Sequence, residues 1–418
     1  MPASDQDRLI GAYEKLLQIS RDMAATSALD DLLGVIVARS MELLDCERAS
    51  LFLYDRGTDE LFSKIAHDAE EIRFPASAGI AGAVAQSTEI LNIPDAYADE
   101  RFNRDVDRQT GFRTRNILAM PLLDHGGQLV GVLEVLNKRT GGFDELDIQL
   151  ASTLAAQAGV ILQRARLLEH YVEKQRMEQS LAIARQIQQD LLPEAAPQVA
   201  GFDIAGWSSP ADETGGDIYD FLDLGDGRWA LMLADATGHG IGPALVIAQT
   251  RAMLRALSSG QLVIPTVMAQ VNDFLVADLS ESRFVTCFFG VLDAPAGRVA
   301  YASAGQGPIV FYDRAADRFD QHAATAMPLG VIEGMDFDEL VDRDLPSGDM
   351  LIVITDGFFE ASDPAGEPFG MERICEMIRR DRDRPAAEII ARLWAAVEAF
   401  TAGAPQADDL TAVIVKRL

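Results

Sequence analysis

The spacing of hydrophobic and polar residues changes along the chain, and the changes divide it into regions. Two stretches with helical spacing come first, the earlier of them within residues 1–24. Apolar runs such as ERASLFLYD, NILAMPLLD and LVGVLEVLNKR follow up to residue 139, and turn residues bound them, which is typical of strands. We therefore predict an N-terminal helix over 1–24 and a mixed domain of helices and strands over 25–145.

The stretch 146–193 contains few residues that break helices. Apolar residues recur in it at steps of mostly three and four, first from Leu150 to Val172 and then from Met177 to Leu191. Such a seam is typical of a parallel coiled coil, and the alternative is an ordinary amphipathic helix packed on its own domain. We predict a helical linker over 146–193 that forms a coiled coil and joins two copies of the chain into a homodimer.

Helical and strand-like stretches alternate again over residues 200–418. Two helical stretches lie within 241–278, FVTCFFGVLD and RVAYASAG have the pattern of paired strands, and helical stretches within 371–401 precede a last strand, LTAVIVK. This order suits two stacked sheets covered by helices, an α-β-β-α sandwich. The predicted fold class of the whole chain is therefore α+β.

Aspartates stand at the ends of several strand-like runs in this last region. They are Asp217 before IYDFLDL, Asp235 after WALMLA, Asp356 after MLIVIT, and Asp408 and Asp409 before LTAVIVK. Taken singly, each is more often a cap of a turn or strand. Together they are expected to converge at one end of the sandwich, where oxygen ligands without histidine or cysteine favour Mg²⁺ or Mn²⁺. Two such ions, roughly 3.5–4 Å apart, would hold a bridging hydroxide and clamp a phosphate.

Several phrases of the C-terminal half occur in a fixed order. They are ARQIQQDLLP (184–193), GGDIYDF (215–221), LADATGHG (233–240), SAGQGPIVFY (303–312), MPLGV (327–331), TDGFFEASDPAGEPFG (355–370) and DDLTAVIV (408–415). By these phrases the region from about residue 180 to the end resembles the bacterial PPM-type serine/threonine phosphatases of the stage II sporulation E family. The resemblance implies an α-β-β-α phosphatase domain with two Mn²⁺ or Mg²⁺ ions.

The resemblance also implies a role for each aspartate. Asp217 and Asp235 would hold the two metals, with Asp235 bridging them and the carbonyl group of Ala236 as a backbone ligand. Asp356 and Asp408 would complete the shell of the second ion. Asp409 is the register alternative to Asp408, and the sequence does not separate the two.

Two residues close to these aspartates have open roles. The family often has histidine where this chain has Gln306, which puts a proton-donating or substrate-positioning role of that loop in doubt. His239 either helps to cap or pack the helix that follows Gly240 or acts as a general acid.

The N-terminal region contains the helix start AGIAGAVAQS and the loop phrase ILNIPDAYADERFNRDVDRQTGFRTRNILAMPL. With its helices and strands it resembles GAF sensory domains over about residues 25–165. One cyclic-nucleotide-binding subgroup has a motif that Asn137, Lys138, Phe143 and Asp147 fit, while Ile148 replaces its final glutamate. The resemblance implies that these residues lock the fold behind the pocket. A cyclic nucleotide, another small ligand and no ligand at all remain alternatives for this domain.

Composition excludes other classes of protein. The 36 basic and 65 acidic residues give a net charge of −29, which disfavours nucleic acid as a partner. None of the three cysteines begins a Cys-x5-Arg loop, so a cysteine-based phosphatase is excluded, and no phosphate-binding Gly-x4-Gly-Lys motif occurs. No apolar stretch approaches the roughly 20 residues of a membrane span. We expect a cytoplasmic protein that does not enter a membrane.

These observations predict a signal-regulated, metal-dependent protein serine/threonine phosphatase under the control of a GAF sensor. By the resemblance, its substrate would be a phosphorylated STAS-domain regulator, an antagonist of an anti-sigma factor. The alternative is a catalytically silent docking module in a partner-switching pathway, and the presence of all four carboxylates counts against it.

Overall fold

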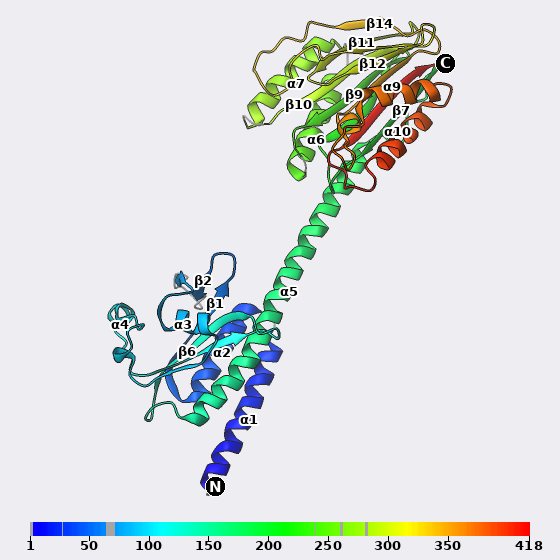
Figure 1. Cartoon of the computed structure of the whole chain (residues 1–418). Helices are drawn as coiled ribbons and strands as arrows, with labels where there is room; N and C mark the ends of the chain where they lie inside the picture. The colour runs from blue at the N-terminus through cyan, green and yellow to red at the C-terminus, as the bar shows by residue number, and fades with distance from the viewer. Residues whose placement is uncertain (1–2, 27, 64–71, 239, 260–261, 281–282) are drawn as a thin grey trace. The chain divides into compact units, whose positions relative to one another are not determined.

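The structure is a computed structural model that describes residues 3–26, 28–63, 72–238, 240–259, 262–280 and 283–418. Its internal contacts divide the chain into two compact units, Met1–Arg176 and Met177–Leu418. The N-terminal unit has one sheet and the C-terminal unit has two (Figure 1), and each unit has its own hydrophobic core.

The N-terminal unit is built on one six-stranded sheet in the order β3-β2-β1-β6-β5-β4, with antiparallel neighbours. Its strands are β1 (Cys46–Asp55), β2 (Glu60–Ser63), β3 (Ile72–Pro75), β4 (Leu91–Ile93), β5 (Ile117–Leu123) and β6 (Leu129–Lys138). Its helices are α1 (Ala3–Ala25), α2 (Leu29–Leu44), α3 (Gly79–Ser87), η1 (Ala96–Ala98), α4 (Arg104–Thr110) and the first part of α5 (Glu145–Leu191). Helices α1, α2 and α5 cover one face of the sheet, and α3 covers the other.

Strand β6 shows how the sequence pattern builds the two faces. Successive side chains of a strand point to opposite faces of its sheet. Leu133 and Val135 therefore belong to the core under α1, α2 and α5, whereas Val132 packs with Ile80 and Val84 of α3. Apolar residues at both parities explain why this strand has a nearly continuous hydrophobic run.

The C-terminal unit contains two five-stranded sheets, in the orders β14-β11-β10-β9-β8 and β13-β12-β15-β16-β7. The strands are β7 (Phe202–Ser209), β8 (Asp217–Gly225), β9 (Arg228–Ala236), β10 (Val285–Asp293), β11 (Arg298–Ala304), β12 (Ile309–Asp313), β13 (Arg318–His322), β14 (Val341–Asp344), β15 (Met350–Ile354) and β16 (Leu410–Arg417). The helices are α6 (Ile241–Leu257), α7 (Ile264–Asp278), α8 (Gly357–Glu360), α9 (Gly370–Asp381) and α10 (Ala386–Phe400).

The two sheets face each other across a core rich in aromatic residues. Tyr301 of the first sheet stacks on Phe311 of the second with ring centroids 6.1 Å apart, and Phe288 lies 5.1 Å from Tyr301. Helices α6 and α7 cover the outer face of the first sheet, and α9 and α10 cover that of the second. The predicted α+β class with a C-terminal α-β-β-α sandwich is therefore confirmed.

Helix α5 has 47 residues, and its apolar seam changes character along its length. Leu150, Leu154 and Ala158 are buried in the core of the N-terminal unit, so this part of the seam packs on its own domain. Val172 and Met177 are 48% and 67% exposed. The coiled coil therefore remains a prediction only for the later part of the helix. Neither α5 nor any other helix among the described residues is both long and apolar enough to cross a membrane.

Candidate active site

Two of the predicted ligands face each other across a pair of neighbouring strands. Asp217, the first residue of β8, lies directly opposite Asp235 near the end of β9. The Ala236 amide donates to the Gly216 carbonyl oxygen at 3.0 Å, and a Cβ atom added to Gly216 would lie 2.5 Å from the Ala236 oxygen. A residue without a side chain is therefore required at 216. This contact brings the β8 start close to the carbonyl group predicted as a backbone ligand.

The second sheet supplies its carboxylates from two adjoining strand ends. Asp356 follows β15, and Asp408 and Asp409 precede the neighbouring antiparallel strand β16. A Cβ atom added to Gly357 would lie 2.1 Å from the Asp409 carbonyl oxygen. The Asp-Gly pair at 356–357 therefore meets a steric need, because the two strand ends approach each other where Asp356 lies.

The aspartates of both sheets influence one another electrostatically. Burial and the charges of Asp356, Asp408 and Asp409 raise the pKa of Asp235. Burial and the charges of Asp235 and Asp409 raise the pKa of Asp217 well above its ordinary value. Such mutual repulsion is what a divalent cation relieves, and oxygen donors without imidazole or thiolate suit Mg²⁺ or Mn²⁺.

The donor set therefore fits a cation in its chemistry. Among the described residues, however, no three aspartate, glutamate, histidine or cysteine side chains surround a single point as a closed ligand set. The structure accordingly brings the predicted carboxylates to one end of the sandwich and defines no coordination geometry for an ion.

Asp408 and Asp409, which the sequence left as alternatives, have different surroundings. The Asp409 carboxylate is buried and accepts hydrogen bonds from the amides of Ala211 at 2.7 Å, Asp217 at 3.3 Å and Gly216. The Asp408 side chain is exposed, and its Oδ1 accepts from the Asp409 amide at 2.8 Å. Asp409 thus holds the main chain that leads into Asp217, whereas the role of Asp408 as a metal ligand remains a prediction.

Thr355 is a supporting residue that the sequence pattern did not single out. Its buried hydroxyl group donates to Oδ2 of Asp217 at 2.9 Å, and its amide donates to the Thr411 carbonyl oxygen at 2.9 Å. The residue thereby fixes a carboxylate of the first sheet from a position on the second sheet. Its position immediately before Asp356, in the segment TDGFFEASDPAGEPFG, was the feature of the sequence that could have indicated this role.

Gln306 and His239 had open roles. The Gln306 side chain is buried, donates from Nε2 to the Ile354 carbonyl oxygen at 2.9 Å and accepts at Oε1 from the Thr286 hydroxyl group at 2.9 Å. Both ends of the amide are engaged inside the protein, so Gln306 acts as a link between β10 and β15. His239 lies outside the described residues.

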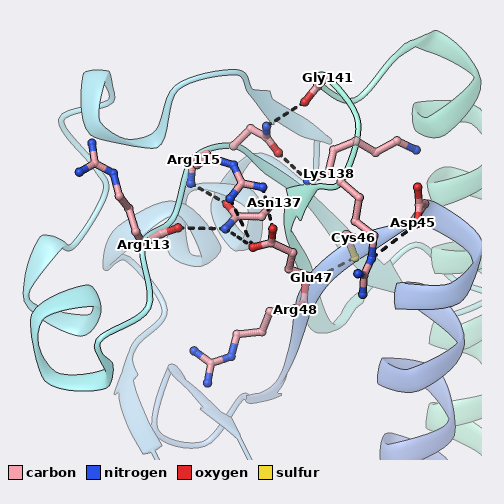
Figure 2. Close-up of polar contacts among 11 residues, drawn as sticks. Asp45, Cys46, Glu47, Arg48, Arg113, Arg115, Asn137, Lys138 and Gly141 are labelled. Atoms are coloured by element: carbon pink, nitrogen blue, oxygen red, sulfur yellow. Dashed lines mark hydrogen bonds and ion pairs between the residues drawn. The ribbon is translucent and has the colours of Figure 1, made fainter.

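In the N-terminal unit, Asn137 is the centre of a polar network (Figure 2). It adopts a left-handed backbone conformation with φ of 59°, and its Oδ1 accepts from the Arg115 amide at 2.6 Å. Its Nδ2 donates to Oε2 of Glu47 at 2.8 Å and to the Arg113 carbonyl oxygen at 2.9 Å. The side chain thus ties the end of β6 to the chain before β5 and to the start of β1.

Lys138, Phe143 and Asp147 lie inside the same unit. The Lys138 Nζ contacts Asp147 Oδ1 at 2.7 Å and donates to the Leu44 carbonyl oxygen at 2.9 Å. Phe143 is buried in the core beneath α5. These contacts join the end of β6 to the start of α5, an arrangement compatible with the predicted lock, whose role remains a prediction.

Comparison with known proteins identifies the class of each unit. Residues 225–418 match the family model of stage II sporulation protein E, and residues 28–162 match that of the GAF domain. The chain therefore combines a GAF domain with a phosphatase domain of the PPM type, also called PP2C, and both predicted resemblances are confirmed.

Similarity to individual proteins covers only part of this chain. The SiaA-PP2C domain of Pseudomonas aeruginosa has the same fold, with a TM-score of 0.52 and 20% identity over 59% of this chain and 98% of that one. A probable 3',5'-cyclic phosphodiesterase, pde-5, of Caenorhabditis elegans is 36% identical over 174 residues, which are 38% of this chain and 23% of the relative. The cGMP-specific 3',5'-cyclic phosphodiesterase of Drosophila erecta is 34% identical over 199 residues, 42% of this chain and 18% of that protein. The chain thus spans about a fifth of the length of these curated relatives.

Proposed function

We propose that this protein hydrolyses phosphoserine or phosphothreonine on a partner protein, with Mn²⁺ or Mg²⁺, under the control of its GAF domain. The observation that carries the proposal is the gathering of Asp217, Asp235, Asp356 and Asp408 at one end of a PP2C-type sandwich. Four carboxylates at one place serve no obvious purpose in packing, because neighbouring like charges repel each other.

Each residue of the site has a task in this reaction. Asp217, Asp235, Asp356 and Asp408, with the Ala236 carbonyl group, would hold two Mn²⁺ or Mg²⁺ ions. When bound, such ions lower the pKa of a coordinated water and neutralise phosphate oxygens. The carboxylates must be ionised to act as ligands, and the raised pKa values of Asp217, Asp235 and Asp356 mean that ion binding displaces protons.

For the partner, we propose a phosphorylated STAS-domain regulator, which rests on the resemblance of the C-terminal unit to the stage II sporulation E family. The acidic surface, with its net charge of −29, repels a phosphoprotein at a distance. Recognition therefore depends on short-range contacts and on cations at the site. A catalytically silent docking module is the second candidate, and the retained carboxylates count against it.

For the sensor, a cyclic nucleotide is the first ligand to test. Relatives that share 34–36% identity with part of this chain are named as cyclic-nucleotide phosphodiesterases. Another small ligand and the absence of any ligand are the alternatives. We also propose that the exposed apolar positions of α5, among them Leu168, Val172 and Met177, pair with a second copy of the chain.

The test is Mn²⁺-dependent release of phosphate from phosphorylated STAS-domain proteins by the full-length chain. Asp235→Asn should lower turnover by at least about a hundredfold, because it removes a ligand predicted to bridge two ions. Asp226→Asn is the matched control: Asp226 is exposed in the turn of the same hairpin, with φ of 54° that asparagine also adopts. Tight binding of the partner without turnover would instead support the docking module.

A further inference from the structure

Arg283 is an exposed arginine that lies close to the candidate active site. Most other basic side chains of the C-terminal unit form ion pairs or donate hydrogen bonds to the main chain. None of the ion pairs or side-chain hydrogen bonds among the described residues involves the Arg283 guanidinium group. This positive charge is therefore available to a partner.

Strand pairing places Arg283 beside the candidate ligands. Thr286 of β10 lies directly opposite Asp235 of β9. The pairing continues past the end of β9, because the Thr237 amide donates to the Phe284 carbonyl oxygen at 3.1 Å. Arg283 is thus three residues from the strand partner of Asp235, which is roughly 10 Å at about 3.3 Å per residue.

The Arg283 side chain lies on the α6 side of the site. A Cβ atom added to Gly242, the second residue of α6, would lie 3.4 Å from both Nη atoms of Arg283. Asp235, in contrast, feels the charges of Asp356 and Asp408, which adjoin the second sheet. A partner whose phosphorylated residue reaches the carboxylates would therefore meet Arg283 with a different group.

Exposed apolar side chains lie on both sides of Arg283. Leu245, in the first turns of α6, is 66% exposed. On the other side, a Cβ atom added to Gly330 would lie 3.9 Å from the Arg283 carbonyl oxygen, and the next residues, Val331 and Ile332, are 46% and 51% exposed. An arginine among exposed apolar residues is typical of a surface that binds another protein.

We propose that Arg283 is a specificity-determining residue that binds a carboxylate of the phosphorylated partner close to its phosphorylated residue. Arginine pairs with carboxylates through charged hydrogen bonds, and the net charge of −29 otherwise repels an acidic partner. The separation of roughly 10 Å corresponds to about three extended residues, which limits where this carboxylate can stand. The inference rests on the proposed function for its substrate, and it adds the chemistry by which that substrate is recognised.

The first experiment compares Arg283→Ala with Arg228→Ala in the full-length protein. Both substitutions remove one exposed positive charge, and Arg228 lies at the end of β9 opposite to Asp235. Turnover is measured with a phosphorylated STAS-domain protein and with p-nitrophenyl phosphate, which carries no carboxylate. The ratio of kcat/KM for the phosphoprotein to kcat/KM for the small substrate should fall about tenfold in Arg283→Ala and stay unchanged in Arg228→Ala.

The charge itself is tested by a conservative variant. Arg283→Lys keeps the charge and loses the forked guanidinium group, so its ratio should stay within about threefold of that of the unsubstituted protein. An unchanged ratio in Arg283→Ala would overturn the proposal, whether both rates are retained or both fall together.

The second experiment measures binding without turnover. Calorimetry with Mn²⁺ in the Asp235→Asn background should show the phosphoprotein binding about tenfold more weakly when Arg283→Ala is added, at about 0.05 M salt. The difference should shrink at about 0.5 M salt, because salt screens an exposed ion pair. An equal difference at both salt concentrations would show a lost apolar contact and would overturn the proposal. Weaker binding of this kind, combined with no turnover by the unsubstituted protein, would refute the proposed hydrolysis and still support Arg283 as the contact.

Discussion

Asp408 and Asp409 are neighbours in the sequence, and we predict that replacing each with alanine affects a different property of the protein. Asp409→Ala removes a buried carboxylate that accepts from the amides of Ala211, Gly216 and Asp217. Asp408→Ala removes an exposed carboxylate whose described hydrogen bond is to the Asp409 amide. The first variant should lose stability, whereas the second should lose activity and keep its fold.

The magnitudes follow from the burial of the amides. An unsatisfied buried donor costs about 1–3 kcal/mol, and the 3.3 Å contact to Asp217 is weaker than the others, so Asp409→Ala should cost roughly 3–6 kcal/mol. That is a large part of the roughly 5–15 kcal/mol by which a domain is stable. Asp408→Ala should change the free energy of unfolding by no more than about 1 kcal/mol, because water can replace an exposed acceptor.

The assay is urea unfolding in the absence of divalent cations, followed by tryptophan fluorescence. All three tryptophans, Trp207, Trp229 and Trp394, belong to the C-terminal unit, so the signal reports that unit alone. Phosphate release under saturating Mn²⁺ is measured in parallel. Equal unfolding midpoints for the two variants, or a less stable Asp408→Ala, would refute the assignment of Asp409 as the residue that holds the loop.

Two further predictions concern a hydroxyl group and a carboxyl group. Thr355→Val should weaken Mn²⁺ binding by about tenfold or more, since a hydrogen bond to a charged group contributes about 1.5–3 kcal/mol. Thr355→Ser, which keeps the hydroxyl group, should restore the affinity. Equal Mn²⁺ affinities of the valine and serine variants, measured by calorimetry, would contradict this prediction. Burial raises the pKa of Glu134 on β6 from 4.5 to about 7, so folding retains a proton and the stability of the N-terminal unit should fall as pH rises from about 4.5 to 7. Glu134→Gln should therefore unfold like the unsubstituted protein at pH 4 and be up to about 3 kcal/mol more stable at pH 8, measured by circular dichroism; equal stability at pH 8 would show that the carboxyl group is not buried in this way.

The strand-end aspartates could be found from sequence because each stands where an apolar run begins or ends. The residues that contact these aspartates in the folded structure could not be found from sequence. Whether Asp408 or Asp409 faces the loop around Gly216 depends on how β16 lies beside β7 and β8, and both residues are equally polar in the sequence. Threonine is common in strands, so the sequence does not distinguish Thr355 from its neighbours. Its hydrogen bond to Asp217, at 2.9 Å, shows that it positions that carboxylate.

The apolar seam of α5 also shows that a sequence pattern does not reveal which residues lie against it in space. A repeat of three and four residues results from any helix that buries one side, whatever covers that side. Leu150 and Leu154 are covered by the unit's own core, while Val172, which belongs to the same repeat, and Met177, which begins the next repeat, are exposed. Periodicity therefore predicted the helix correctly and could not say which part of its surface remains available to a partner.

The division of the candidate ligands between the two sheets has a mechanical consequence. Asp217 and Asp235 belong to strands of one sheet, and Asp356 and Asp408 adjoin strands of the other, so a shift of one sheet against the other would change the distances between the two pairs. The stacked pair of Tyr301 and Phe311 sets that spacing from within the core. If the four carboxylates bind ions as proposed, a substitution at this aromatic pair that changes the spacing of the sheets would change ion binding without altering any carboxylate.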